Sequence, residues 1–193
     1  YLLLLLWIFF TVVLLGWVLI ASFSTTKEIF ANKLLSSGFH FENYEKAWVN
    51  SDVSTIFFNS LFYSLLSVCL LILVCAPAAY ALSRFEFFGN KLMQHSFVAS
   101  MGVPVVMIVL PLFALVAGLD ILNNVTANKF TLIFLYVGIN VPYTTIFLMG
   151  FFANISRAFE EAAAIDGCPP GKTFWLIMLP MAQPGIITVS IFN

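Results

Sequence analysis

The stretch FEEAAAIDGCPPGKTFWLIMLP, from Phe159 to Pro180, decides how the rest of the sequence is interpreted. It carries four charged side chains and lies between two runs apolar enough to sit in lipid. Alanine and glutamate favour helix, so we expect a helix from Arg157 to Ile165. Gly167 can adopt the left-handed conformation that ends a helix. The stretch therefore predicts a short polar helix that ends in a glycine turn between two membrane spans.

A second short helix is expected after this turn. Pro169 and Pro170 prevent simple continuation of the first helix, and proline suits the first turn of a new one. We expect the second helix at about Gly171–Leu179, with Pro180 separating it from the last apolar run. The alanines at 162–164 have little bulk, so another protein could approach closely. The residues alone leave two interpretations open, a docking element or an ordinary amphipathic loop.

The composition indicates a membrane protein. The chain is 62% hydrophobic and 9% charged, with a mean hydropathy of +1.03. Soluble domains are about 45–50% apolar and about 25% charged, and a soluble core could not hide this much apolar surface. The net charge of -1 argues against a nucleic-acid partner. The three cysteines and two histidines show no metal-ligand spacing, so neither a metal site nor a cofactor is expected.

The apolar runs predict an all-α, polytopic membrane bundle that forms one domain over residues 1–193. A helix needs about 20 residues to cross the hydrocarbon core. The first run stays apolar to about Phe23, which favours a span over a signal peptide. Because residue 1 is Tyr rather than Met and the last run stops short, we expect a fragment that lacks its start and at least one C-terminal span. The expected spans are residues 1–23, 55–83, 92–117, 131–152 and a truncated fifth at 181–193, with a polar loop at 153–180.

Polar side chains within the spans have two interpretations. They can join helices by hydrogen bonds, or they can line a substrate path. The stretch GINVPYTT at 138–145 favours the path, because Pro142 frees a backbone carbonyl in mid-span. Asn140 and Tyr143 are therefore the candidate substrate-path residues. No charged residue falls within the expected spans, which argues against an ion-coupled transporter or a channel.

The long polar loop Ser24–Ser54 holds Tyr44 and Trp48 on one helical face. This spacing fits a membrane-surface anchor or a docking surface, and both remain open. Four Lys and Arg residues lie in the loops on each side of the expected membrane. The charge distribution therefore leaves the orientation undecided.

A spaced set of residues in the opening stretch carries a family resemblance. Glu161-Ala162-Ala163, Gly167, Ile177 and Leu179-Pro180 fit the pattern E-A-A-x3-G-x9-I-x-L-P. In this pattern the chain resembles the EAA loop of the permease subunits of binding-protein-dependent ABC importers. The stretches NYEKAW (43–48), NSLFYS (59–64) and AAYALSRFEFFGNK (78–91) make it similar to the carbohydrate branch, which includes the smaller permease subunit of the maltose transporter. Ser156, where this branch often has proline, and Cys168, where alanine is usual, depart from the pattern outside its fixed positions.

The resemblance implies a multi-pass protein of a bacterial-type inner membrane with six spans, five of them visible here. It implies that the EAA loop is cytoplasmic and docks on a separate ATPase, which places Ser24–Ser54 outside. The implied partners are a second permease subunit, a dimer of the ATP-binding cassette ATPase, an extracytoplasmic solute-binding protein and the lipid bilayer. The chain has no phosphate-binding loop, so it is expected to be non-catalytic. The residues expected to couple to the ATPase are Glu160, Glu161, Ala162, Ala163, Asp166, Gly167, Ile177, Leu179 and Pro180.

The predicted function is therefore that of a permease subunit of an ATP-driven importer, with sugars as the favoured substrates. It would couple ATP hydrolysis by a separate subunit to alternating access. Permeases for amino acids, peptides or anions share the EAA loop and are the main alternative. A membrane enzyme is disfavoured because His40 and His95 are isolated and Asp120 has no acidic neighbour in its loop.

Overall fold

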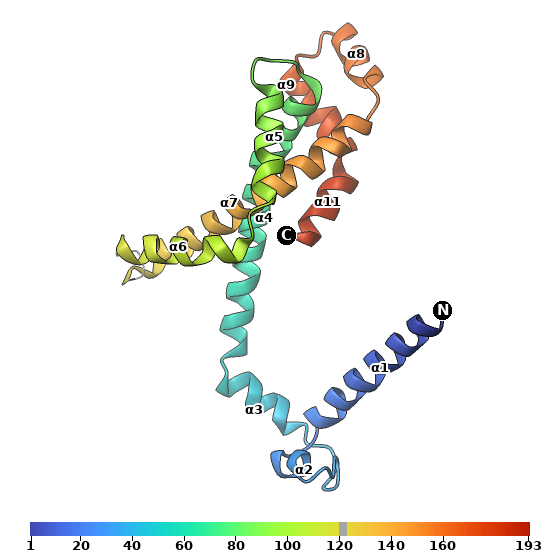
Figure 1. Cartoon of the computed structure of the whole chain (residues 1–193), viewed down its shortest axis with the longest axis vertical. Coiled ribbons are helices and arrows are strands. Elements are labelled where there is room, and N and C mark those ends of the chain that lie inside the picture. Colours follow the sequence, from blue (N-terminus) through green and yellow to red (C-terminus); the bar gives the residue numbers. More distant parts are fainter. Residues whose placement is uncertain (120–122) are drawn as a thin grey trace. The chain divides into compact units, whose positions relative to one another are not determined.

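The computed structural model describes residues 1–119 and 123–193, and these residues form helices and connecting turns without a strand (Figure 1). The all-α prediction is thereby confirmed; Asp120 lies outside the described residues. Within the described ranges, three helices are long and apolar enough to cross a membrane, and two bent helix pairs raise the number to five if each pair is one span. The chain divides into two compact units, Tyr1–Ser60 and Leu61–Asn193.

The first unit begins with helix α1 (Leu2–Ser22), which is almost entirely apolar and has no buried residue. A helix that is hydrophobic on every side is suited to lipid or to another protein. Helices α2 (Thr26–Phe30) and α3 (Glu42–Asn50) follow. The hydroxyls of Ser22 and Tyr44 lie 2.6 Å apart, and the Phe23 ring packs against Tyr44 with 5.2 Å between centroids. The end of α1 is thus joined to α3.

The loop between α1 and α3 is organised around the buried carboxylate of Glu28. This carboxylate accepts hydrogen bonds from the backbone N–H of Thr25 at 2.8 Å and from the hydroxyls of Ser36 and Ser37, each at 2.7 Å. The bonds from Ser36, Thr25 and Ser37 hold the pKa of Glu28 well below its usual range. Hydrogen bonds to a charged carboxylate, and not a hydrophobic core, therefore hold this short polar segment together.

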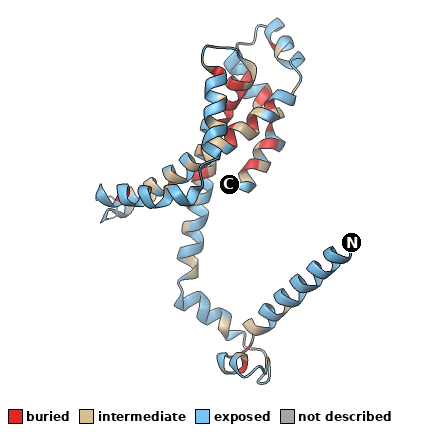
Figure 2. Ribbon diagram, in the orientation of Figure 1, coloured by how far each residue is buried: buried red, intermediate tan, exposed pale blue. Residues whose placement is uncertain are grey.

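The second unit is built around helices α4 (Val53–Arg84), from Leu61 onward, and α7 (Val125–Asn154). Helices α5 (Asn90–Met101) and α11 (Gln183–Phe192) pack against α7 (Figure 1). Buried residues concentrate where these helices meet (Figure 2). The core consists of Leu71, Cys75, Ala76, Ala79, Tyr80, Leu148, Phe152, Phe174, Met178, Ala182 and Val189.

The residues expected to form a single span at 92–117 belong to two helices. Helix α5 ends at Met101, α6 (Val105–Gly118) begins after Pro104, and the pair is bent by 93°. Pro104 has extended backbone angles (φ -61°, ψ 128°). It lacks a backbone N–H, and the residue before a proline is disfavoured in helix. Pro77, Pro111 and Pro142, in contrast, lie inside helices α4, α6 and α7.

Candidate coupling site and substrate groove

The first part of the 153–180 loop folds as a helix that ends in a glycine turn. Helix α8 (Ala158–Ile165) is followed by Gly167 in the left-handed conformation, with φ +74°. The N–H of Cys168 donates to the carbonyl of Ala163 at 2.8 Å, the six-to-one hydrogen bond of a Schellman turn. Helix α9 (Pro170–Thr173) then begins with Pro170 in its first turn. The local structure expected from Gly167 and the two prolines is present.

The second part of the loop differs from the expected single helix. Helix α9 continues into a π-helical turn, η2 (Phe174–Met178), and then into α10 (Leu179–Met181). Pro180 was expected to separate this helix from the last apolar run, but it lies within α10, and the 68° bend comes after Met181. Proline clashes with the carbonyl four residues earlier in an α-helix. The wider π turn directly before Pro180 relieves that clash, so the helix passes through the proline.

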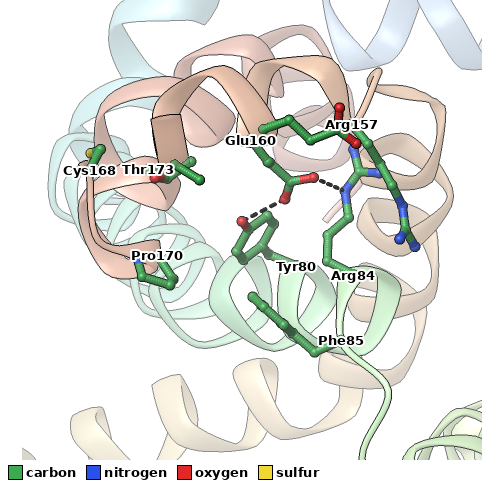
Figure 3. Close-up of a pocket in the computed structure, with 10 residues that line it drawn as sticks. Tyr80, Arg84, Phe85, Arg157, Glu160, Cys168, Pro170 and Thr173 are labelled. Atoms are coloured by element: carbon green, nitrogen blue, oxygen red, sulfur yellow. Dashed lines mark hydrogen bonds and ion pairs between the residues drawn. The ribbon is translucent and has the colours of Figure 1, made fainter. Parts of the chain in front are cut away.

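Glu160 is held by two side chains from the end of α4 (Figure 3). The Tyr80 hydroxyl donates to Glu160 Oε1 at 2.7 Å, and Arg84 Nε lies 3.4 Å from Glu160 Oε2. The Arg84 guanidinium also donates from Nη2 to the carbonyl oxygen of Ile155, the residue after α7. Arg84 and Glu160 have side chains 5% and 20% exposed. The pair is therefore shielded from water and geometrically fixed.

A cavity of about 340 Å³ lies beside this ion pair. Figure 3 shows the side chains of Arg157, Cys168, Pro170 and Thr173 around it, together with Tyr80 and Arg84. The cavity lies between the end of α4 and both arms of the glycine turn. The hollow therefore lies at the base of the 153–180 loop, next to the carboxylate of Glu160.

The predicted coupling residues divide into an outward set and an inward set. Glu161, Ala162, Asp166, Gly167 and Pro180 are exposed. Ala163 is only 4% exposed. Glu160 is engaged by α4, while Ile177 and Leu179 pack against the core of the second unit. We name four exposed members of the predicted set, Glu161, Ala162, Asp166 and Gly167, the outer face. The contact of the outer face with an ATPase stays a prediction.

Asn140 and Tyr143 line one groove of about 540 Å³. Its other walls come from the break between α5 and α6, including Ser100 and Val103, and from Phe134 of α7. Asn140 Nδ2 donates to the carbonyl of Tyr136 at 3.0 Å, which leaves its amide oxygen as an acceptor. Sequence reasoning missed Ser100 and Phe134. The G-V-P sequence at 102–104 is a signal for the break between α5 and α6. The continuous apolar character of residues 92–117 favours one unbroken span and so hides that signal.

No group of three or more His, Cys, Asp or Glu side chains in the described ranges is arranged to hold a metal ion. Cys69, Cys75 and Cys168 are free thiols.

Residues 73–193 match the family described as "Binding-protein-dependent transport system inner membrane component". The diacetylchitobiose uptake system permease protein NgcG of Streptomyces coelicolor is 37% identical over 192 residues, which cover 99% of this chain and 62% of that protein. The probable ABC transporter permease protein YurM of Bacillus subtilis is 32% identical over 178 residues, which cover 92% of this chain and 58% of that protein.

A third relative is the trehalose transport system permease protein SugB of Mycobacterium tuberculosis, 29% identical over 175 residues that cover 91% of this chain and 62% of that protein. This chain thus spans about three-fifths of the length of these relatives. A crystal structure of a bacterial ABC transporter involved in alginate import contains a chain with a TM-score of 0.72 at 22% identity, covering 97% of this chain and 69% of that one. That likeness shows a shared fold. On the match of residues 73–193, the chain belongs to the family of inner-membrane components of binding-protein-dependent transport systems.

Proposed function

We propose that this chain is part of the permease subunit of an ATP-driven importer for sugars. The observation that carries the proposal is the outer face, which combines the carboxylates of Glu161 and Asp166 with the small side chain of Ala162 on one rigid helix–turn–helix. Family membership supports the transport role. The α8–α9 element would dock on a separate ATP-hydrolysing subunit, and the chain itself would catalyse no reaction.

The geometry suits docking for three reasons. Ala162 and Gly167 allow a partner surface to come close. The Schellman turn holds α8 and α9 as one body, so a force on α8 is carried to α9. Glu161 is exposed and can pair with a cation of the ATPase, where a partly desolvated pair gives orientation and specificity.

The transport step follows from this rigidity. When ATP closes the ATPase subunits, the α8–α9 element is displaced, and the displacement passes through η2 and α10 to α11. Rigid-body rotation of packed helices is a recognised route between two conformations. The permease would thus alternate between states that open to opposite sides of the membrane. A second permease subunit and an extracytoplasmic solute-binding protein complete the proposed assembly.

The substrate class rests on the relatives and on the groove. The names of two of the three relatives specify a sugar, diacetylchitobiose in one and trehalose in the other. The groove offers the Asn140 amide, the Tyr143 hydroxyl and aromatic rings, which together suit the hydroxyls and apolar faces of a sugar. We propose a small oligosaccharide or disaccharide as the substrate.

The test is reconstitution of the full-length protein with its co-expressed permease, ATPase and binding protein in lipid nanodiscs. ATP hydrolysis is measured with a panel of sugars, amino acids and peptides. Stimulation by a sugar is expected. If only an amino acid or a peptide stimulates ATP hydrolysis, that compound class replaces sugars as the proposed substrate. If no ATPase co-purifies, the permease assignment is overturned.

Glu161→Lys provides the matched variant for the docking surface, because it reverses one exposed charge. ATPase recovery with the purified complex should fall, whereas Glu45→Lys, which reverses an exposed charge of helix α3 outside the α8–α9 element, should leave recovery nearly unchanged. Equal recovery for Glu161→Lys and the unaltered protein would remove Glu161 from the interface.

A further inference from the structure

We propose that Tyr80, Arg84 and Glu160 form a latch that fastens the coupling helix α8 to the end of the membrane helix α4. The two adjacent glutamates would then have different tasks, with Glu160 positioning α8 and Glu161 left free for a partner. The assignment of α8 as a coupling helix rests on the proposed function. The latch itself is argued from contacts within this chain.

The latch joins residues that are far apart in sequence. Glu160 lies 80 residues after Tyr80, and each of its two carboxylate oxygens has its own partner on α4, at 2.7 Å for Tyr80 and 3.4 Å for Arg84 (Figure 3). The Tyr80 contact is a hydrogen bond to a charged acceptor, which is stronger than a neutral one. The Arg84 contact is an ion pair in which Nε does not form a hydrogen bond. Together the two contacts engage both carboxylate oxygens, which opposes rotation of the carboxylate as well as its translation.

Tyr80 cannot easily turn its hydroxyl away from Glu160, because its ring is enclosed. The ring is 5% exposed and lies against Phe85, Phe152 and Phe174, with centroid separations of 5.7, 5.6 and 5.1 Å. Phe174 belongs to the π-helical turn η2. Tyr80 therefore contacts both arms of the coupling loop, α8 through its hydroxyl and η2 through its ring.

Arg84 extends the latch to a third helix. While its Nε faces Glu160, its Nη2 donates to the carbonyl of Ile155, which ends α7. With a side chain only 5% exposed, Arg84 would be left with an uncompensated buried charge if Glu160 were removed, a costly situation. Arg84 at the end of α4 thus contacts both the residue that follows α7 and the carboxylate of α8. Through these contacts, a displacement of α8 would move α4 as well as α11.

The first test measures the latch without reference to transport. Amide hydrogen exchange of α8 is recorded for the full-length protein in lipid nanodiscs, comparing Tyr80→Phe and Glu160→Gln with Glu161→Gln. Tyr80→Phe keeps the enclosed ring and removes only the hydroxyl. We expect α8 amides to exchange about tenfold faster or more in Tyr80→Phe and Glu160→Gln, and at the unaltered rate in Glu161→Gln.

The second test asks whether the latch transmits motion or only supports the fold. In the reconstituted complex, Tyr80→Phe should retain the ATPase and hydrolyse ATP but import several-fold less sugar per ATP. The double variant with Glu160→Gln should lose no more than the worse single variant. An unchanged ratio of sugar to ATP would overturn the transmitting role.

The outcomes separate the latch from the proposed function. Unchanged α8 exchange in both Tyr80→Phe and Glu160→Gln would overturn the latch, whatever the transport result. Faster exchange in these variants, with an unaltered protein that binds no ATPase, would support the latch and overturn the permease assignment.

Discussion

Gly185 of α11 lies so close to Phe151 of α7 that a Cβ atom on the glycine would stand 2.6 Å from the ring carbons Cγ and Cδ2. The ring carbons fill the space that any other residue would need. This contact is where the last helix packs on α7. It fixes the separation of two helices that the bend at Ala182 brings together.

Gly185→Ala should therefore destabilise the protein. Because the partly buried ring of Phe151 must shift to admit the methyl group, we expect a loss of about 1–3 kcal/mol, the usual cost of overpacking. Thermal unfolding of the full-length protein in detergent is the measurement. Gly150→Ala is the control, since a Cβ at Gly150 of α7 meets no atom within 4 Å. Equal melting temperatures for the two variants would show that the contact is not tight.

Replacing Ala162 or Ala163 with a larger side chain should have different effects. The change at Ala163 should lower stability, whereas the change at Ala162 should lower ATPase recovery. Ala163 is 4% exposed, so Ala163→Leu should overpack the base of α8 and cost about 1–3 kcal/mol of stability. Ala162 is exposed, so Ala162→Leu should change the free energy of unfolding by no more than about 0.5 kcal/mol but reduce ATPase recovery. Normal recovery with Ala162→Leu would place the docking surface elsewhere.

At Gly167 the backbone conformation, and not a lack of space, should restrict which residues can replace the glycine. A Cβ there meets open space, but φ is +74°, which costs other residues about 1–2 kcal/mol. Gly167→Val should therefore misorient α9 and uncouple ATP hydrolysis from transport while the protein still inserts in the membrane. Gly167→Asn, which tolerates this conformation better, should be milder. Full coupling in Gly167→Val would contradict the need for this turn.

Glu28 should make the first loop sensitive to acid. Its pKa lies below the ordinary value of 4.5 because Ser36, Thr25 and Ser37 donate to the carboxylate. A depressed pKa contributes stability above the ordinary value and loses it as pH falls toward the folded pKa. Amide protection over residues 25–40, meaning the exchange rate relative to that of an unstructured chain at the same pH, should hold from pH 7 to about pH 4.5 and fall below it.

Glu28→Gln is the matched variant for this loop, because it keeps the shape and removes the charge. Its loop should exchange faster than the original at pH 7, and the difference should shrink in strong acid. Identical exchange at neutral pH would show that the charge contributes nothing to the loop.

Asn140→Ala tests the groove. The substitution removes an amide that lines the groove and donates to the Tyr136 carbonyl within its own helix. We expect sugar import to fall several-fold while ATPase recovery and folding remain normal. Thr188→Ala is the control, since its hydroxyl also bonds within its own helix and it does not line the groove. Normal import by Asn140→Ala would remove Asn140 from the substrate path.

The sequence allowed the membrane class and the glycine turn to be predicted because both depend on local chemistry. Apolar runs separated by polar loops dictate helices in lipid, and Gly167 followed by two prolines fits one kind of turn. The course of the chain at Pro180 was predicted wrongly, because a proline is a helix breaker only when the preceding turn is α-helical. The π turn that accommodates it has no simple sequence signal.

The division of the coupling residues could not be predicted because it depends on tertiary contacts. Glu160 and Glu161 are adjacent and chemically equal, and only the position of α4 makes one internal and the other exposed. The same holds for Ala162 and Ala163. A motif identifies which residues matter, while packing determines the direction each one faces.

The bend between α5 and α6 has a consequence for hydration. At about 1.5 Å per residue, helices of 12 and 14 residues are about 18 and 21 Å long, so neither alone crosses about 30 Å of hydrocarbon. If the pair is one span, its interrupted backbone at Gly102–Pro104 lies at a depth where lipid cannot supply hydrogen bonds. The N–H groups of Gly102 and Val103 donate to the carbonyls of Ala99 and Ser100, and Pro104 has no N–H. Water in the adjacent groove, which is lined by Met101 and Val103, would therefore serve the carbonyl groups of the break even when no solute passes.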